Sequence, residues 1–186
     1  GTRFRYRSSG RLPRPCWNCP AGLKRPRLRP PLVDVVDPAK RSEMMAGIGA
    51  KNTKPEIVVR QILHRLGYRF RLHRKDLPGK PDIVLPKWNT VIFVQGCFWH
   101  GHDNCPLFRL PRSRTDFWDE KITANRQRDM VTREKLRDAG WRQVEVWECA
   151  TKGRTALEPE LLARRIDEAV KSASKQTVDI KGAQIA

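Results

Sequence analysis

Residues 95–105 concentrate the side chains of this chain that can bind a metal ion or transfer a proton. The segment reads Gln-Gly-Cys-Phe-Trp-His-Gly-His-Asp-Asn-Cys, and it holds two of the four histidines and two of the five cysteines. Cys97, His102 and Cys105 are zinc-ligand types, and a tetrahedral structural site requires a fourth ligand. Cys149, at the end of a strand-like run, is the candidate for that position. A closed site of this kind would be structural and not catalytic.

The same residues allow a second interpretation, in which the cysteines are small buried apolar side chains and His102 lies at the surface. In the zinc interpretation, His100 is left outside the coordination shell. An imidazole that is held rigidly beside such a site, without being part of it, is well placed to act as a general base. His100 is therefore a candidate catalytic residue.

Asp82 follows a Pro-Gly-Lys-Pro turn at the start of a predicted strand. An ordinary turn aspartate is one interpretation. In the other, a hairpin brings Asp82 near the end of the next strand, 90–94, which leads into the segment 95–105. Mg²⁺ could then take oxygens from Asp82 and the Val94 carbonyl and keep water and phosphate as its other ligands. A metal on the scissile phosphate and a base for the attacking water are what phosphodiester hydrolysis requires.

The elements that must position these residues alternate between helices and strands. Thr53 is the predicted N-cap of the first helix, with Glu56 completing a capping box, and Gly67 ends that helix. Thr115 or Ser113 is expected to cap a long helix that Gly140 ends. The remaining predicted elements are strands at 68–72, 82–85, 90–94 and 141–149 and a helix at 160–172. This order predicts an α/β sandwich around a mixed sheet.

The charge of the chain favours a polyanionic partner. The 186 residues carry a formal net charge of +18, from 38 basic and 20 acidic residues. Nine of the basic residues and no acidic residue precede Asp34, so the rest of the chain still carries +9. Nucleic acid is the favoured polyanion, because phosphate neutralisation releases counterions. The alternative is a basic surface that serves solubility alone.

Composition divides the chain into three parts. Residues 1–37 form a basic, Arg/Pro-rich leader that we expect to be disordered, and its isolated Cys16-x-x-Cys19 pair is not expected to bind zinc. Residues 38–175 form the predicted domain, and residues 176–186 a flexible tail. No apolar run approaches the roughly 20 residues of a membrane span, and no signal peptide is evident. We therefore expect a cytoplasmic protein.

Four motifs in this order resemble the very short patch repair (Vsr) DNA mismatch endonucleases. They are Leu-Pro-Gly-Lys-Pro-Asp at 77–82, Val-Ile-Phe-Val-Gln-Gly-Cys-Phe-Trp-His at 91–100, Arg-Thr-Asp-Phe-Trp-Asp-Glu-Lys-Ile at 114–122 and Trp-Glu-Cys-Ala at 147–150. The resemblance extends from about Arg41 to Gly153. It implies a restriction-endonuclease-like three-layer sandwich, with a mixed central sheet flanked by helices. It also implies a bacterial, nucleoid-associated monomer that uses Mg²⁺ to nick duplex DNA 5′ to the thymine of a T:G mismatch, with mismatch-repair proteins as potential partners.

The resemblance also implies roles for individual residues. Asp82 and the Val94 carbonyl would bind Mg²⁺, and Glu56 would hold one of its water molecules. His100 would activate the attacking water, with its imidazole oriented by Asp129. The structural zinc ligands would be Cys97, His102, Cys105 and Cys149. The DNA-contacting residues would be Phe98 and Trp99, which enter the base stack at the mismatch, Met45, which enters from the other groove, and Gln95.

The chain departs from the family pattern at two places. Gln95 stands where family members commonly carry a histidine, and an amide can hold water or phosphate but cannot donate as an imidazolium. The loop after His100 reads Gly-His-Asp-Asn and not a run of histidines. A sequence-specific or broader nicking or restriction endonuclease, or a zinc-containing DNA-binding module without catalysis, are the rival functions.

Simpler roles also exist for individual site residues. Asp129 could pair with Arg126 or Arg128 on its own helix. Glu56 could serve only as a helix cap. Phe98 and Trp99 could both belong to the core, although adjacent residues in an extended segment point in opposite directions.

Overall fold

The computed structural model describes Asp37, Lys40, Glu43, residues 51–173 and residues 176–184. These residues belong to one compact unit, Asp34–Ala186. The predicted leader, apart from Asp37, and Met45 lie outside the described residues. None of the described helices is both long enough and apolar enough to span a membrane.

A mixed sheet forms the centre of the fold. Its five strands lie in the order of the sequence, and they are β1 (Arg71–Leu72), β2 (Ile83–Leu85), β3 (Thr90–Gln95), β4 (Arg142–Trp147) and β5 (Val178–Ile180). The first three strands pair antiparallel, and β3, β4 and β5 pair parallel. The predicted α/β fold with a mixed sheet is thus confirmed.

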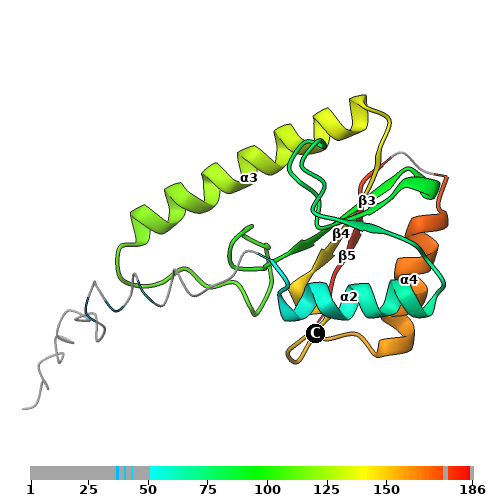
Figure 1. The fold of residues 1–186 in the computed structure, drawn as a ribbon. Helices are drawn as coiled ribbons and strands as arrows, with labels where there is room; N and C mark the ends of the chain where they lie inside the picture. The colour runs from blue at the N-terminus through cyan, green and yellow to red at the C-terminus, as the bar shows by residue number, and fades with distance from the viewer. Residues whose placement is uncertain (1–36, 38–39, 41–42, 44–50, 174–175, 185–186) are drawn as a thin grey trace, which may run out of the picture. The chain divides into compact units, whose positions relative to one another are not determined.

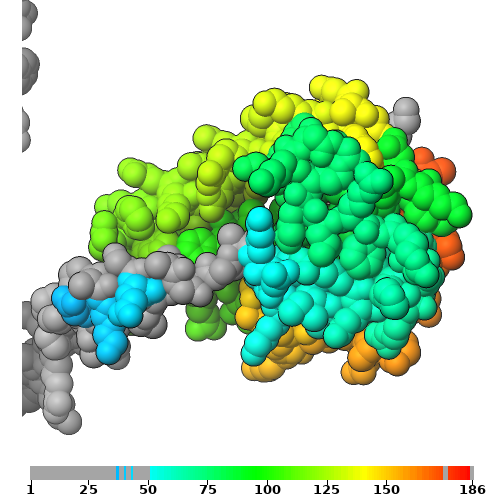
Figure 2. Space-filling model, in the orientation of Figure 1, coloured from blue at the N-terminus to red at the C-terminus, as the bar shows by residue number. Residues whose placement is uncertain are grey.

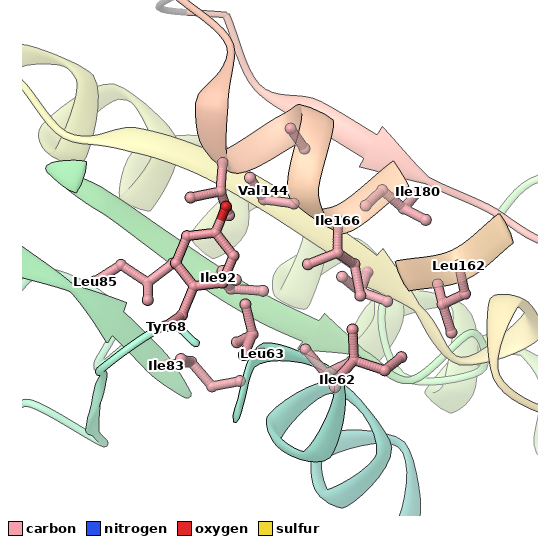
Figure 3. Packing of buried hydrophobic residues seen from close by; sticks show 14 of the residues in the cluster. Ile62, Leu63, Tyr68, Ile83, Leu85, Ile92, Val144, Leu162, Ile166 and Ile180 are labelled. Carbon is pink, nitrogen blue, oxygen red and sulfur yellow. The ribbon is translucent and has the colours of Figure 1, made fainter. Parts of the chain in front are cut away.

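Helices cover both faces of the sheet (Figure 1). They are α2 (Lys54–Arg65), α3 (Thr115–Asp138) and α4 (Pro159–Lys171). Because successive strand residues point to opposite faces, Ile83 packs toward α2 and α4, while Val84 contacts Leu136 of α3 on the other side. Figure 3 shows the larger cluster, in which side chains of α2 and α4 interlock with those of the sheet.

The first helix begins as the sequence predicted. The Thr53 hydroxyl accepts a hydrogen bond from the Glu56 amide at 3.4 Å, and the Glu56 carboxylate accepts one from the Asn52 amide at 2.9 Å. The first bond satisfies one of the amide groups that a helix start leaves free, and the second reaches Asn52, the residue before the N-cap. Together the two bonds fix Glu56 in the first turn with its side chain buried.

Four sequence predictions about element boundaries are wrong. The strand predicted at 68–72 is limited to Arg71–Leu72, and the strand predicted at 141–149 ends at Trp147, where the 3-10 helix Glu148–Ala150 begins.

Neither Thr115 nor Ser113 caps α3: the N-cap is Arg114, with φ of 54°, and it provides no side-chain cap bond. Instead, the Thr115 hydroxyl donates back to the Pro111 carbonyl. The predicted flexible tail, 176–186, contains β5, because the edge of β4 offers a parallel partner and the core buries Ile180.

Candidate active site

A cleft of about 1140 Å³ lies where the start of α2, the loop before β2, the end of β3 and the middle of α3 come together. In Figure 2 the surface is hollowed beside the cyan residues at the start of α2. The side chains that line the cleft include most of the predicted catalytic and DNA-contacting residues, namely Glu56, Asp82, Val94, Gln95, Phe98, Trp99, His100 and Asp129.

An acidic group with one imidazole lies on one side of the cleft. Glu56 comes from the first turn of α2, His73 follows β1, and Asp82 precedes β2. One donor atom from each of these residues lies within 4.8 Å of the others. Carboxylate oxygens and an imidazole nitrogen at such separations can together hold a divalent cation.

Asp82 is held against the end of β3. The paired register of β2 and β3 stops at Ile83 and Ile92, and beyond it the Asp82 carboxylate accepts a hydrogen bond from the Val94 amide at 2.8 Å. Burial raises the pKa of Asp82 to about 6, the hydrogen bond from Val94 opposes the rise, and the Glu56 charge adds to it. A bound cation would stabilise the charged form of a poorly solvated carboxylate that lies beside a second carboxylate.

His73 and Arg60 are members of this group that the sequence interpretation missed. Arg60 donates to the Glu56 carboxylate at 2.6 Å and approaches His73 Nε2 at 3.1 Å. The available signal for His73 was its place one residue after a basic, alternating strand, opposite the Asp82 turn of the same hairpin. Arg60 had a weaker signal, its spacing of four residues from Glu56 on one helix face.

The second part of the cleft is a hydrogen-bonded pair from distant parts of the chain. His100 Nδ1 lies 2.6 Å from the Asp129 carboxylate of α3. Asp129 thus pairs with His100 and not with Arg126 or Arg128, which bond to Asp103 and Asn125. With Nδ1 facing a carboxylate, a neutral imidazole carries its proton there and leaves Nε2 able to accept one.

Two further side chains of α3 hold the loop that carries His100. Asn125 donates to the Trp99 carbonyl at 2.8 Å, and Arg126 donates to the Gly101 carbonyl. Gly101 has φ of 60°, a conformation that glycine adopts at low cost. One helix thus fixes both the loop backbone and the ring of His100.

The four predicted zinc ligands lie together at the carboxyl ends of β3 and β4. Gln95 pairs with Trp147 in the parallel register. Cys97 lies two residues beyond Gln95, and Cys149 lies two residues beyond Trp147. One donor atom each from Cys97, His102, Cys105 and Cys149 lies within 4.8 Å of the others. No disulfide involves the three cysteines, which are the ones in the described part of the chain.

The distances within this group fit a tetrahedral metal site. His102 Nδ1 lies 3.5 Å from the sulfurs of both Cys97 and Cys149. A sulfur and a nitrogen bound to one zinc ion in tetrahedral geometry are about 3.6 Å apart. The hydrogen bond between the two thiols lowers the pKa of Cys149 and, together with burial, raises that of Cys97, so Cys149 is the thiolate of the pair and Cys97 would lose its proton when a metal binds.

The aromatic residues before His100 are neither core nor fully exposed. Phe98 and Trp99 are half-buried, and their ring centroids lie 5.3 and 6.1 Å from that of Trp118 on α3. Lys121 lies over the Trp99 ring, 5.7 Å from its centroid. Gln95 is buried at the end of β3 and lines the same cleft. The cleft therefore joins aromatic surface to the acidic group.

Comparison with known proteins identifies the relationship. The family model described as DNA mismatch endonuclease Vsr matches residues 33–106. The DNA mismatch endonuclease Vsr of Escherichia coli is 43% identical over 137 residues, which cover 74% of this chain and 87% of that protein. The type II nicking enzyme V.XorIIP of Xanthomonas oryzae is 51% identical over 130 residues, which cover 70% of this chain and 95% of the relative. The type II nicking enzyme V.NmeAIP of Neisseria meningitidis is 44% identical over 141 residues, which cover 75% of this chain and the whole relative. The chain therefore belongs to the DNA mismatch endonuclease Vsr family.

Proposed function

We propose that this protein is a Mg²⁺-dependent DNA endonuclease with a restriction-endonuclease-like fold that nicks one strand of duplex DNA 5′ to the thymine of a T:G mismatch. The observation that carries the proposal is the presence, in one cleft, of the His100–Asp129 pair and the carboxylates of Glu56 and Asp82. Family membership and the names of the relatives supply the substrate class.

The acidic side of the cleft suits a hard divalent cation. Asp82 and the Val94 carbonyl would hold Mg²⁺, and Glu56 would hold water of its shell. The N–H and C=O of one strand residue face the same neighbouring strand. The hydrogen bond from the Val94 amide to the Asp82 carboxylate therefore indicates that the Val94 carbonyl also faces Asp82. A bound cation would polarise the scissile phosphate and neutralise developing negative charge.

His100 would accept the proton of the attacking water at Nε2. Asp129 holds Nδ1, which selects the tautomer with a free Nε2 and stabilises the imidazolium that forms. His100 also lines the cleft, where a phosphodiester could reach it. His100 would thus supply the base for the attacking water, and the acidic group would supply the cation on the scissile phosphate.

Recognition of the mismatch would depend on the aromatic edge of the cleft, which is formed by Phe98 and Trp99. Phe98 and Trp99, with Met45 from the segment before α2, would enter the base stack, and a mismatched step is the cheapest place to open it. Gln95 would hold a water molecule or a phosphate oxygen. The net charge of +18 supports binding to duplex DNA through its phosphates.

A closed circular duplex with one T:G pair tests the nicking activity. With Mg²⁺ the expected product is the open circle, and removal of Mg²⁺ from the buffer should stop its formation. Linear product would indicate cleavage of both strands and overturn the proposal. Equal nicking of the same circle without the mismatch would favour a sequence-specific nicking enzyme, a possibility that the relatives named type II nicking enzymes raise.

Cys149→Ser is expected to remove the structural zinc and destabilise the domain. Cys97, His102, Cys105 and Cys149 would bind one Zn²⁺, and three remaining ligands hold zinc much less tightly. The free energy of unfolding should fall by more than about 3 kcal/mol, since structural zinc contributes about 10–16 kcal/mol in small domains. Metal analysis and urea denaturation measure both effects.

The Cys16→Ser/Cys19→Ser double variant is the matched control, because that pair is not expected to bind zinc. It should retain about one zinc per chain. Full zinc content in Cys149→Ser would contradict the zinc assignment.

Trp99→Ala is expected to weaken binding to T:G duplexes by about 5- to 150-fold, because stacking of a base on an aromatic ring contributes about 1–3 kcal/mol. Binding to a matched duplex should change much less. Phe117→Ala is the control, since Phe117 is an exposed aromatic residue of α3 that does not line the cleft. Titration of labelled duplexes measures the affinities, and equal losses on both duplexes would contradict a role at the mismatch.

A further inference from the structure

We propose that His73 is a protein ligand of the catalytic cation, in the group that also contains Glu56 and Asp82, so that the site accepts a nitrogen-binding transition ion such as Mn²⁺ as well as Mg²⁺. This inference rests on the proposed function, because it concerns the same cation. It gives His73 a direct role in binding that cation.

The ring of His73 lies between the two carboxylates. Its Nδ1 is 3.9 Å from an Asp82 oxygen, and its Nε2 is 3.9 Å from a Glu56 oxygen. Two donors on one ion at about 2.1 Å are about 3 Å apart at right angles and about 4 Å apart on opposite sides. One ion binds only one ring nitrogen, so a single one of these separations applies to it, and each is close to the value for two donors on opposite sides of an ion. One donor atom from each of the three residues lies within 4.8 Å of the others.

The backbone holds His73 in this place. The register of β1 and β2 pairs Leu72 with Ile83, and the next pair along it is His73 with Asp82. The His73 amide donates to the Asp82 carbonyl at 3.2 Å, which continues the ladder by one bond. His73 also has φ of 47°, so the chain turns directly at this residue. A local backbone bond thus joins the two residues before any ion binds.

Arg60 determines which ring nitrogen has a lone pair. An arginine side chain only donates hydrogen bonds. Its Nη2 atom, 3.1 Å from His73 Nε2, therefore requires Nε2 to accept. The nitrogen that faces Glu56 is thus the unprotonated one, which is the form that binds metals.

Arg60 also behaves as a stand-in cation. Its Nη2 contacts both Glu56 and His73, at 2.6 and 3.1 Å. Its Nε is buried without a hydrogen-bond partner among the residues that the structure describes. Its Nη1 donates to the Asn52 side chain at 2.7 Å, so Nε is the donor that the fold leaves unsatisfied. A metal ion that displaced Nη2 would bond to the same two residues.

The types of donor atom in the site determine how strongly each ion binds. Mg²⁺ favours an oxygen shell, whereas nitrogen and oxygen donors together favour first-row transition ions. Removing the imidazole should therefore reduce Mn²⁺ affinity more than Mg²⁺ affinity. His73→Gln keeps a polar side chain of similar length but has no ring nitrogen.

The test uses the zinc-loaded full-length protein with Mn²⁺ as the probe. Pulsed electron paramagnetic resonance detects an imidazole nitrogen bound to Mn²⁺, and Mn²⁺ titration gives the affinity. The wild type should show the nitrogen coupling, and His73→Gln should lose it together with at least about tenfold in Mn²⁺ affinity. His64→Gln is the matched control, because His64 is an exposed residue of α2 that does not line the cleft, and it should behave as the wild type.

Two results would overturn the inference: a wild type without Mn²⁺ binding or nitrogen coupling, and a His73→Gln variant that retains the coupling, which would assign it to another histidine. A nicking assay on T:G duplex separates this failure from failure of the proposed function. Nicking without nitrogen coupling would reject only the ligand role of His73. Nitrogen coupling in a protein that does not nick would reject the endonuclease proposal and leave the metal site standing.

Discussion

Replacing His100 by alanine is expected to lower the rate constant of nicking by about 10²- to 10⁴-fold, the usual contribution of a positioned general base. The variant keeps the cation site and the aromatic edge, so the affinity for T:G duplex should change little. Single-turnover nicking at saturating enzyme measures the chemical step separately from binding. His64→Ala is the control, because that histidine does not line the cleft.

Asp129→Asn tests how the ring is oriented. An asparagine amide could donate to His100 Nδ1, which would place the ring proton on Nε2 and prevent it from accepting another. We therefore expect a loss of the same order as in His100→Ala. A His100→Ala or Asp129→Asn enzyme that nicks within tenfold of the wild type would contradict the assignment of the base.

Asp82→Asn is expected to abolish nicking and, at the same time, to stabilise the protein at neutral pH. The charged carboxylate is needed for the cation but is costly to bury in its absence. The amide oxygen can still accept the hydrogen bond from Val94. Loss of function with a gain in stability would distinguish a strained functional charge from a structural one.

The raised pKa of Asp82 gives the sign and the pH range of this effect. The pKa is about 6 in the folded protein, against an ordinary value of 3.8, so the folded state binds more protons between these values. The stability that the protonated group contributes is fully present below pH about 4 and is lost as pH rises through about 6. At pH 7 the loss is about 1–3 kcal/mol, and Asp82→Asn should recover it.

Urea denaturation of zinc-loaded protein without Mg²⁺ measures the stability gain. The difference between wild type and Asp82→Asn should grow from pH 4 to pH 7. Asp103→Asn is the control, because Asp103 is an exposed carboxylate. A destabilised Asp82→Asn protein, or a difference that does not change with pH, would contradict the buried-charge account.

Residue type and strand order were sufficient to predict part of the site. Cys97 and Cys149 each follow a run of strand residues, and parallel pairing of β3 with β4 brings such positions together. The hairpin of β2 and β3 likewise brings Asp82 to Val94. The pairing of His100 with Asp129 was predicted from the family resemblance, because helical spacing alone also allowed Arg126 or Arg128 as partners of Asp129.

The elements that escaped prediction depend on tertiary contacts. Three residues of β5 are too few to show a periodic pattern, and their pairing depends on the exposed edge of β4. His73 acquires its place from the β1–β2 register and a turn at positive φ. Arg114 begins α3 without a side-chain cap, which no local rule predicts.

Mapping the cut position in a duplex that contains one T:G mismatch tests the central claim most directly. Each strand would carry its own end label, with Mg²⁺ present, and wild type would be compared with His100→Ala and with a matched duplex. The account predicts a single cut, 5′ to the mismatched thymine, on that strand alone, and its loss in the variant. Cutting of the matched duplex at a fixed sequence, or binding of the T:G duplex without any cut, would contradict it.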